Sequence, residues 1–262
     1  MLLKIDNIAK ENLEDAINLC IPIQYREKKC FKEGIKVKRR WGVSMLEKYG
    51  GFGKIAYIDG KPVGIIQYEP LLRERVIEIR CIFVPEEKYR RRGIGKAMLL
   101  DLIDEMRKPK VYFQNSKPYA LVTYAFQTSA GYPQHFFYLK MGFKRVAKDD
   151  PYLLYYPLKE DYVYRKTEEK YISQKEDMGK ALIFYDPFCP WCMFFVDKMR
   201  KALREIAPNI TIRIINEFEE KEEVEKRGTI YNCIVNGKPI KAFVGDKEKF
   251  REEVLSALKN DY

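Results

Sequence analysis

One stretch of the sequence, residues 76–106, constrains the fold more than any other part of the chain. It reads VIEIRCIFVPEEKYRRRGIGKAMLLDLIDEM. Nearly every residue up to Val84 is β-branched or apolar, and Pro85, which cannot donate to a ladder, follows, so this part predicts a strand. Beyond Gly93, apolar residues recur up to Met106 with the i, i+3, i+4, i+7 spacing of one helical face. The stretch therefore predicts a strand, a charged loop and a helix.

The turn before this helix has the chemistry of an anion-binding site. Backbone N–H groups at a helix start have no intrahelical partner, and the helix dipole adds positive potential there, which suits a phosphate or pyrophosphate. Gly93 and Gly95 lack a Cβ and let an anion approach the backbone. Four cationic residues surround the same point: Arg90, Arg91, Arg92 and Lys96. A basic strand–helix connection that merely has glycines in its turn is the alternative.

The pattern Arg90-x-x-Gly93-x-Gly95 resembles the Arg/Gln-x-x-Gly-x-Gly/Ala signature of the GNAT superfamily of acetyl-CoA-dependent N-acetyltransferases. Downstream, the YLKMGF run from Tyr138 to Phe143 resembles the second motif of that family. The resemblance implies that the loop holds the pyrophosphate of coenzyme A and that the preceding strand pairs with the pantetheine arm. The cofactor-binding residues it implies are Ile82, Phe83, Val84, Arg90, Arg91, Arg92, Gly93, Ile94, Gly95, Lys96 and Ala97. It also implies a mixed α/β fold over residues 1–160, with a mostly antiparallel sheet that splits at the cofactor site.

Two catalytic residues follow from this resemblance. In many GNAT enzymes the tyrosine of the second motif protonates the departing thiolate, so Tyr138 is the candidate general acid; the alternative is a core tyrosine with its hydroxyl satisfied elsewhere. The strand residue Glu78 resembles the glutamate of histone-type acetyltransferases and is the candidate general base. Glu78 can equally be an ion-pair partner of Arg80, with a water chain taking the proton instead.

The C-terminal part of the chain predicts a separate domain. Residues 161–179 are dense in charge and predict a linker, and residues 180–262 resemble thioredoxin. A strand leads into Cys189-Pro190-Trp191-Cys192, which opens a helix; a strand, a charged helix, a hairpin at Asn236-Gly237 and a final helix follow. Acetyltransferases with such a tail resemble the YoaP-like family, and this resemblance covers the whole chain.

The pair Cys189 and Cys192 is a candidate redox dithiol. A Cys-x-x-Cys after a strand is typical of redox sites, and a helix N-terminus lowers the pKa of the first thiol. Thr229, however, stands where the thioredoxin family usually has a cis-proline that shapes the substrate groove. An active and a vestigial dithiol therefore both remain possible.

Composition excludes several other classes of protein. A hydrophobic content of 46% is enough for packed cores, and no apolar run approaches the ~18 residues of a spanning helix. The N-terminus becomes polar too soon for a signal peptide, so we expect a cytoplasmic protein. The net charge is +11, but the basic run 28–40 lacks the interleaved aromatics of a stacking platform and predicts a solvated face rather than a nucleic-acid site. His135 is the only histidine, and with one Cys-x-x-Cys it cannot build a zinc site, so we expect no metal.

The sequence thus predicts an acetyl-CoA-dependent N-acetyltransferase that modifies a primary amine of a small molecule or a peptide. Two helices, predicted over residues 11–20 and 37–49, are expected to wall the acceptor side. The alternative is a thiol–disulfide oxidoreductase in which the N-terminal fold only binds coenzyme A or a partner. The acceptor and the oligomeric state do not follow from the sequence.

Overall fold

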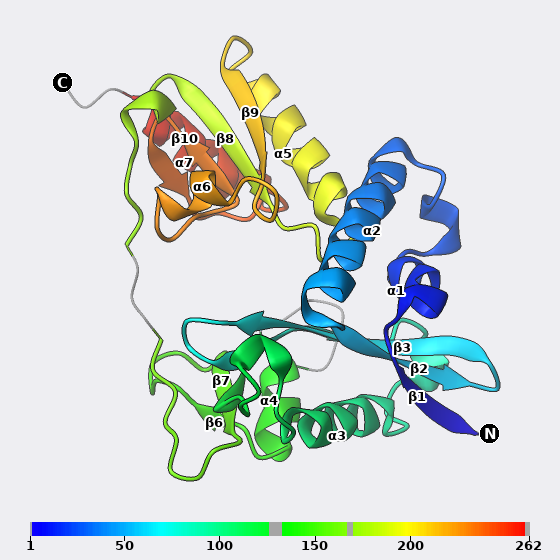
Figure 1. The fold of residues 1–262 in the computed structure, drawn as a ribbon. Helices are drawn as coiled ribbons and strands as arrows, with labels where there is room; N and C mark the ends of the chain where they lie inside the picture. Colours follow the sequence, from blue (N-terminus) through cyan, green and yellow to red (C-terminus); the bar gives the residue numbers. More distant parts are fainter. Residues whose placement is uncertain (1, 126–132, 167–169, 260–262) are drawn as a thin grey trace. The chain divides into compact units, whose positions relative to one another are not determined.

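The computed structural model describes residues 2–125, 133–166 and 170–259 (Figure 1). The chain divides into two compact units. The first unit comprises Met1–Cys20 and Gly42–Thr167, and the second comprises Ile21–Trp41 and Glu168–Tyr262. The sequence predicted two consecutive domains, residues 1–160 and 180–262. The observed units are not consecutive, because residues 21–41 group with the C-terminal part of the chain. Within the described residues, no helix has both the length and the apolar composition needed to cross a bilayer.

The first unit is built on a seven-stranded sheet of order β1-β2-β3-β4-β5-β7-β6. All neighbouring strands are antiparallel except β4 and β5, which are parallel. Among the described residues these two strands pair only from Ile77 to Ile79, although β4 continues to Phe83. This mixed sheet, mostly antiparallel and open beside β4, is the one that the sequence predicted. The strands are β1 (Leu3–Asn7), β2 (Gly53–Ile58), β3 (Lys61–Leu71), β4 (Val76–Phe83), β5 (Ala120–Tyr124), β6 (Lys144–Arg145) and β7 (Leu153–Pro157).

Helices cover both faces of this sheet. Alternate residues of a strand point to opposite faces, and β2 identifies the helix on each. Lys54 forms ion pairs with Asp101 and Glu105 of α3 (Ile94–Met106), whereas the Tyr57 hydroxyl donates to Asp15 of α1 (Leu13–Asn18) at 2.8 Å. Figure 1 shows α1 and α3 on opposite sides of the sheet. We call these the α1 face and the α3 face.

The main core of the first unit lies between the sheet and α3. Its buried members include the predicted helix stripe Leu99, Leu102, Ile103 and Met106. The second-motif helix, α4 (Gln134–Lys140), follows Pro133 as predicted and adds to this core. The predicted strand end at Phe126 and the loop up to residue 132 lie outside the described residues.

The helix predicted over residues 37–49 is longer than expected: α2 runs from Lys29 to Tyr49. The basic run 28–40 is therefore not simply a solvated face. Phe31 and Lys38 are 1% and 0% exposed, while most of the other lysines and arginines in the run face solvent. The helix predicted over 11–20 is shorter, with α1 preceded by a 3-10 turn at Lys10–Asn12.

The second unit contains a four-stranded sheet of order β11-β10-β8-β9. Strands β8 and β9 are parallel, and the other neighbours are antiparallel. The predicted order of strand, helix, strand, helix, hairpin and helix is observed. The elements are β8 (Lys180–Tyr185), α5 (Cys192–Ile206), β9 (Thr211–Asn216), α6 (Lys221–Glu225), β10 (Cys233–Val235), β11 (Lys238–Ile240) and α7 (Lys247–Leu258).

The described part of the predicted linker is packed rather than extended. The Ile172 N–H donates to the Arg227 carbonyl at 2.9 Å, and Tyr171 forms an isolated β-bridge with Gly228. Asp177 is 1% exposed and pairs with Arg227. These residues fold as part of the second unit.

Candidate active site

The structure places Gly93 directly before α3, as the anion site requires. Its φ of +79° lies in the left-handed region, where glycine is favoured. The Ala97 N–H donates to the Gly93 carbonyl at 2.9 Å, so the amides of residues 94–96 precede the first helical hydrogen bond. A Cβ built on Gly93 would meet no atom of residues 2–125, 133–166 or 170–259 within 4 Å. The helix start is therefore open to an approaching anion, and the residues present fit the diphosphate of a coenzyme A molecule.

Arg90 has a different role from the mobile cation that its position suggested. Its Nε donates to the Val84 carbonyl at 3.0 Å and its Nη2 to the Pro85 carbonyl at 2.7 Å. The side chain thus fixes the end of the strand to the loop. Arg91, with φ +58°, and Lys96 lie exposed around the helix start.

The end of β4, the start of α3 and α4 lie side by side. A Cβ on Gly95 would be 3.7 Å from Cδ1 of Ile82 and 3.8 Å from Cζ of Phe137, which are ordinary contacts. Ile82 packs against the core, while Phe83 is 37% exposed at the strand end. The predicted pantetheine strand and pyrophosphate loop are therefore neighbours in space.

Tyr138 lies on α4 where the β4–β5 pairing ends. It is 1% exposed, and its hydroxyl hydrogen-bonds with Thr123, whose Oγ1 donates to the Ile79 carbonyl at 3.0 Å. Burial raises the pKa of Tyr138 well above its ordinary value of 10; the hydrogen bond with Thr123 opposes this rise and the nearby Cys81 adds to it. The phenol is therefore protonated at neutral pH, as a general acid must be.

Glu78 is engaged in an ion pair. Its Oε2 lies 3.1 Å from Nη1 of Arg80, which is also 4.0 Å from Oε2 of Glu69. Glu69 and Glu78 face each other across β3 and β4, and all three side chains are about one-quarter exposed. The ion-pair alternative for Glu78 is thus observed, and its role as a base stays a prediction.

Tyr138, on α4, and Glu78, on β4, lie on opposite faces of the sheet. Ile77 and Ile79 join the core on the α3 face together with Tyr138. Glu78, between them in sequence, points to the α1 face. The two predicted catalytic residues therefore flank β4.

Sequence reasoning missed two residues at this point of the sheet. One is Thr123, which links Tyr138 to β4. The other is Gln67, which is 1% exposed and whose Oε1 has no hydrogen-bond partner among the described residues. Gln67 lies opposite Cys81, beside a β-bulge that leaves Arg80 as the extra residue of β4. A glutamine within the apolar run VGIIQY was the available signal.

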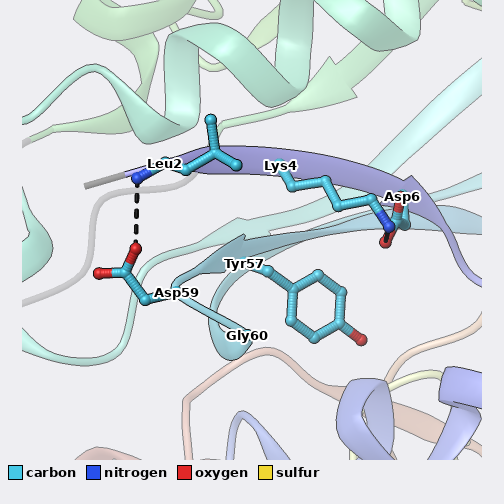
Figure 2. A pocket seen from close by; sticks show the side chains of 6 residues that line it. All are labelled: Leu2, Lys4, Asp6, Tyr57, Asp59 and Gly60. Atoms are coloured by element: carbon cyan, nitrogen blue, oxygen red, sulfur yellow. Dashed lines mark hydrogen bonds and ion pairs between the residues drawn. The ribbon is translucent and has the colours of Figure 1, made fainter.

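A cavity of about 350 Å³ lies elsewhere in the first unit, at the β1–β2 edge (Figure 2). Its polar groups are paired with one another or with neighbours: Lys4 binds Asp6 at 2.8 Å, and the Leu2 N–H donates to Asp59 at 3.3 Å. It contains none of the predicted site residues and offers no chemistry for group transfer. The lining residues are Leu2, Lys4, Asp6, Tyr57, Asp59 and Gly60.

The dithiol of the second unit lies where the sequence predicted it. Cys192 is the first residue of α5, and its N–H donates to the Cys189 carbonyl at 3.0 Å. All six cysteines are thiols. Burial, with Cys189 nearby, raises the pKa of the Cys192 thiol, whereas Cys189 is partly exposed. Thr229 lies in the connection between α6 and β10.

Residues 51–145 match the family model described as the acetyltransferase (GNAT) domain. The matched segment contains the cofactor loop, α3 and α4 and ends just beyond the second motif. Over these residues, the match confirms the predicted acyltransferase class of enzyme.

Several solved structures are similar to about 60% of the chain. The PaiA N-acetyltransferase of Thermoplasma acidophilum, in complex with coenzyme A, is 17% identical, with a TM-score of 0.41 over 60% of this chain and 99% of that one. A GNAT-family acetyltransferase of Staphylococcus aureus is 19% identical, with a TM-score of 0.43 over 60% of this chain and 100% of that one. The ribosomal-protein-S18-alanine N-acetyltransferase of Escherichia coli is 17% identical, with a TM-score of 0.39 over 62% and 100%. No curated protein that was compared matches this chain.

Proposed function

We propose that the chain is an acetyl-CoA-dependent N-acetyltransferase that acetylates a primary amine of a small molecule or a peptide. We also propose that its second unit is an accessory thioredoxin-like domain of the YoaP-like kind. The observation that carries the first proposal is the helix start at Gly93, whose leading amides and open side suit a diphosphate, inside the segment that matches the domain model.

In this proposal, different residues of the chain bind different parts of the cofactor. The amides of residues 94–96 and the cations Arg91, Arg92 and Lys96 hold the diphosphate, and the backbone of Ile82–Val84 runs beside the pantetheine arm. Arg90 keeps the strand end against the loop. Bound acetyl-CoA supplies an activated acetyl thioester. Tyr138 holds a proton on its hydroxyl beside the opening between β4 and β5, ready for a departing thiolate.

The acceptor amine enters on the α1 face in this proposal. Glu69 and Glu78 present carboxylates there, and Gln67 presents a buried carbonyl oxygen that accepts no hydrogen bond from the residues that the structure describes. These groups suit the N–H donors of an ammonium ion. Glu78 then receives the proton that the ammonium must lose, while Arg80 holds its carboxylate in place. Acceptor and thioester thus meet at β4 from opposite faces.

An amine screen with acetyl-CoA tests this function. Tyr138→Phe should lower turnover by roughly 10²-fold, the usual contribution of a general acid, while calorimetric affinity for acetyl-CoA is largely kept. The matched control is Tyr155→Phe, which removes a hydroxyl from another buried tyrosine of the same unit, outside the α4 core. Failure to bind acetyl-CoA would exclude the function. An equal loss in both variants would show that Tyr138 is only structural.

The second candidate function is thiol–disulfide exchange, and the dithiol geometry favours it. A partly exposed Cys189 and a buried Cys192 with a raised pKa are the arrangement expected of an attacking and a resolving thiol. Reduction of insulin disulfides tests it. A Cys189→Ser variant is the control, and equal activity in the two proteins would exclude this function.

A further inference from the structure

Residues 21–41 lie on the Cys-Pro-Trp-Cys turn of the second unit. The Trp191 ring meets the edge or face of two aromatic rings from this segment, at centroid distances of 6.3 Å for Tyr25 and 4.8 Å for Phe31. Phe31 also stacks on Phe194 of α5 at 5.6 Å and is 1% exposed. An aromatic cluster therefore covers the tryptophan between the two cysteines.

The helix backbone itself touches this turn. A Cβ on Gly34 would lie 2.0 Å from the Pro190 carbonyl oxygen, closer than any real Cβ approaches such an atom. Glycine in a helix interior costs about 1 kcal/mol relative to alanine, so this glycine needs a reason, and the close approach supplies it. At the other end of the segment, Arg40 Nε pairs with Glu219 at 3.3 Å.

The buried residues of α2 between Phe31 and Trp41 lie on the helix face that contains Gly34, which contacts Pro190. Phe31, Gly34, Lys38 and Trp41 are buried and recur with the spacing of one helical face. A disulfide-bearing partner must reach the residues around Cys189 to exchange thiols with it. The chain's own segment already occupies the part of that surface that Pro190 and Trp191 form.

We propose that residues 21–41 are an intramolecular cover docked on Pro190 and Trp191 of the dithiol turn, and that a small disulfide reaches the partly exposed Cys189 faster when this cover lifts. With glutathione disulfide, the Cys189 thiolate attacks one sulfur, forms a mixed disulfide and releases one glutathione. Cys192 then loses its proton to solvent, attacks the Cys189 sulfur and releases the second glutathione. Two protein thiols are oxidised and one glutathione disulfide is reduced to two thiols.

Residues 29–41 of the cover belong to the longer helix α2, which gives the contact a further consequence. α2 continues to Tyr49, and its residues from Gly42 onward are counted in the first unit. If docking favours one redox state of the dithiol, that redox state favours docking by the same factor, because the linkage is reciprocal. The redox state of Cys189 and Cys192 is thereby coupled to the helix.

Gly34→Ala tests the cover in the full-length, reduced protein. Alanine favours the helix more than glycine does, so α2 stays folded, but the new Cβ cannot coexist with the Pro190 carbonyl. The matched control is Gly42→Ala, the same change on the same helix, where the Cβ would meet only side-chain atoms of Leu13 and Phe52 at 3.0 and 3.4 Å. Cys233, 2% exposed, serves as an internal reference for unfolding.

The measurement is the rate of thiol labelling at each cysteine, followed by mass spectrometry of peptides. We expect Gly34→Ala to raise labelling of Cys189 severalfold, because undocking removes the segment that lies on Pro190 and Trp191 beside this partly exposed thiol. Gly42→Ala should leave it unchanged, and Cys233 should stay slow in both. Phe31→Ala, which removes the ring from Trp191, should raise Cys189 labelling independently. The proposal is overturned if either variant labels Cys189 at the wild-type rate, or if Cys233 reacts in parallel in both.

Discussion

The buried pair of Asp177 and Arg227 makes a prediction about where the second unit begins. Arg227 donates from Nη2 and Nε to the two carboxylate oxygens of Asp177, at 2.6 and 2.9 Å, and the side chains are 0% and 1% exposed. Its Nη1 donates to Glu223 at 2.7 Å. Replacing Asp177 by leucine leaves the Arg227 guanidinium buried, with its Nε and Nη2 groups deprived of the carboxylate to which they donate.

The expected loss is large for a unit of this size. Removing one partner of a buried ion pair costs about 3–5 kcal/mol, against a total stability of about 5–15 kcal/mol for a typical domain. With an m-value of about 2 kcal/mol/M, a loss of 3 kcal/mol moves the urea midpoint down by roughly 1.5 M. Both tryptophans, Trp41 and Trp191, belong to the second unit, so fluorescence follows the unfolding of this unit.

A double-mutant cycle separates the pair from the cost of either substitution. Asp177→Leu and Arg227→Met should each destabilise the unit, and the double variant should lose less than their sum, because it buries no unpaired charge. The control is Arg213→Met. The Arg213 side chain is 43% exposed, and its ion pairs with Glu220 and Glu223 therefore contribute less than about 1 kcal/mol to stability. Additive losses, or an Asp177→Leu midpoint equal to that of the control, would refute the reasoning. Residues before 180 would then be a linker after all.

Three further predictions concern the first unit, its cofactor and acid stability. Lys54→Met leaves Asp101 without the Lys54 cation and Glu105 with Lys110 as its remaining ion-pair partner, and should lower the midpoint of thermal unfolding of the first unit, followed by circular dichroism, with a loss of about 1–3 kcal/mol. Gly93→Ala forces a side chain into the left-handed region, at about 1–2 kcal/mol, and into the open side of the helix start; calorimetry should give weaker acetyl-CoA binding. Burial alone would raise the pKa of Glu223, but the surrounding cations outweigh it and lower the pKa to about 2. Its stabilisation is therefore present above the unfolded value of about 4.3 and is lost as pH falls toward 2; urea midpoints by fluorescence should fall over that window, and Glu223→Gln should flatten the fall.

Local patterns predicted the elements that surround the cofactor loop. The strand at 76–83 and the helix at 94–106 lie within a residue or two of their expected bounds, because apolar runs and a glycine turn are signals within single segments. The hairpin of β2 and β3 turns at Asp59 and Gly60, both with positive φ, as an Asp-Gly pair favours.

Contacts between distant segments were not predictable in the same way. The guanidinium of Arg90 binds carbonyls of its own loop, and the hydroxyl of Thr123 binds across to β4, although neither contact leaves a mark in local composition. The basic run 28–40 looked solvated because its charges dominate the composition. The partner that buries Phe31 is Trp191, far along the chain, so no window of sequence around residue 31 contains both rings.

The arrangement of side chains on the α1 face of the sheet depends on one extra residue in β4. With unbroken pairing, Arg80 would face Gln67, and Cys81 would turn toward the α3 core. The bulge pairs Cys81 with Gln67 and Ile82 with Ile66 instead, so the strand presents Arg80 and Cys81 to the α1 face and returns Ile82 to the core. A one-residue slip reverses every later side chain. Deleting Arg80 should instead remove the bulge without such a slip: Cys81 stays opposite Gln67 and Ile82 stays in the core, while Glu69 and Glu78 lose the cation that pairs with them, even though every motif residue remains in the sequence.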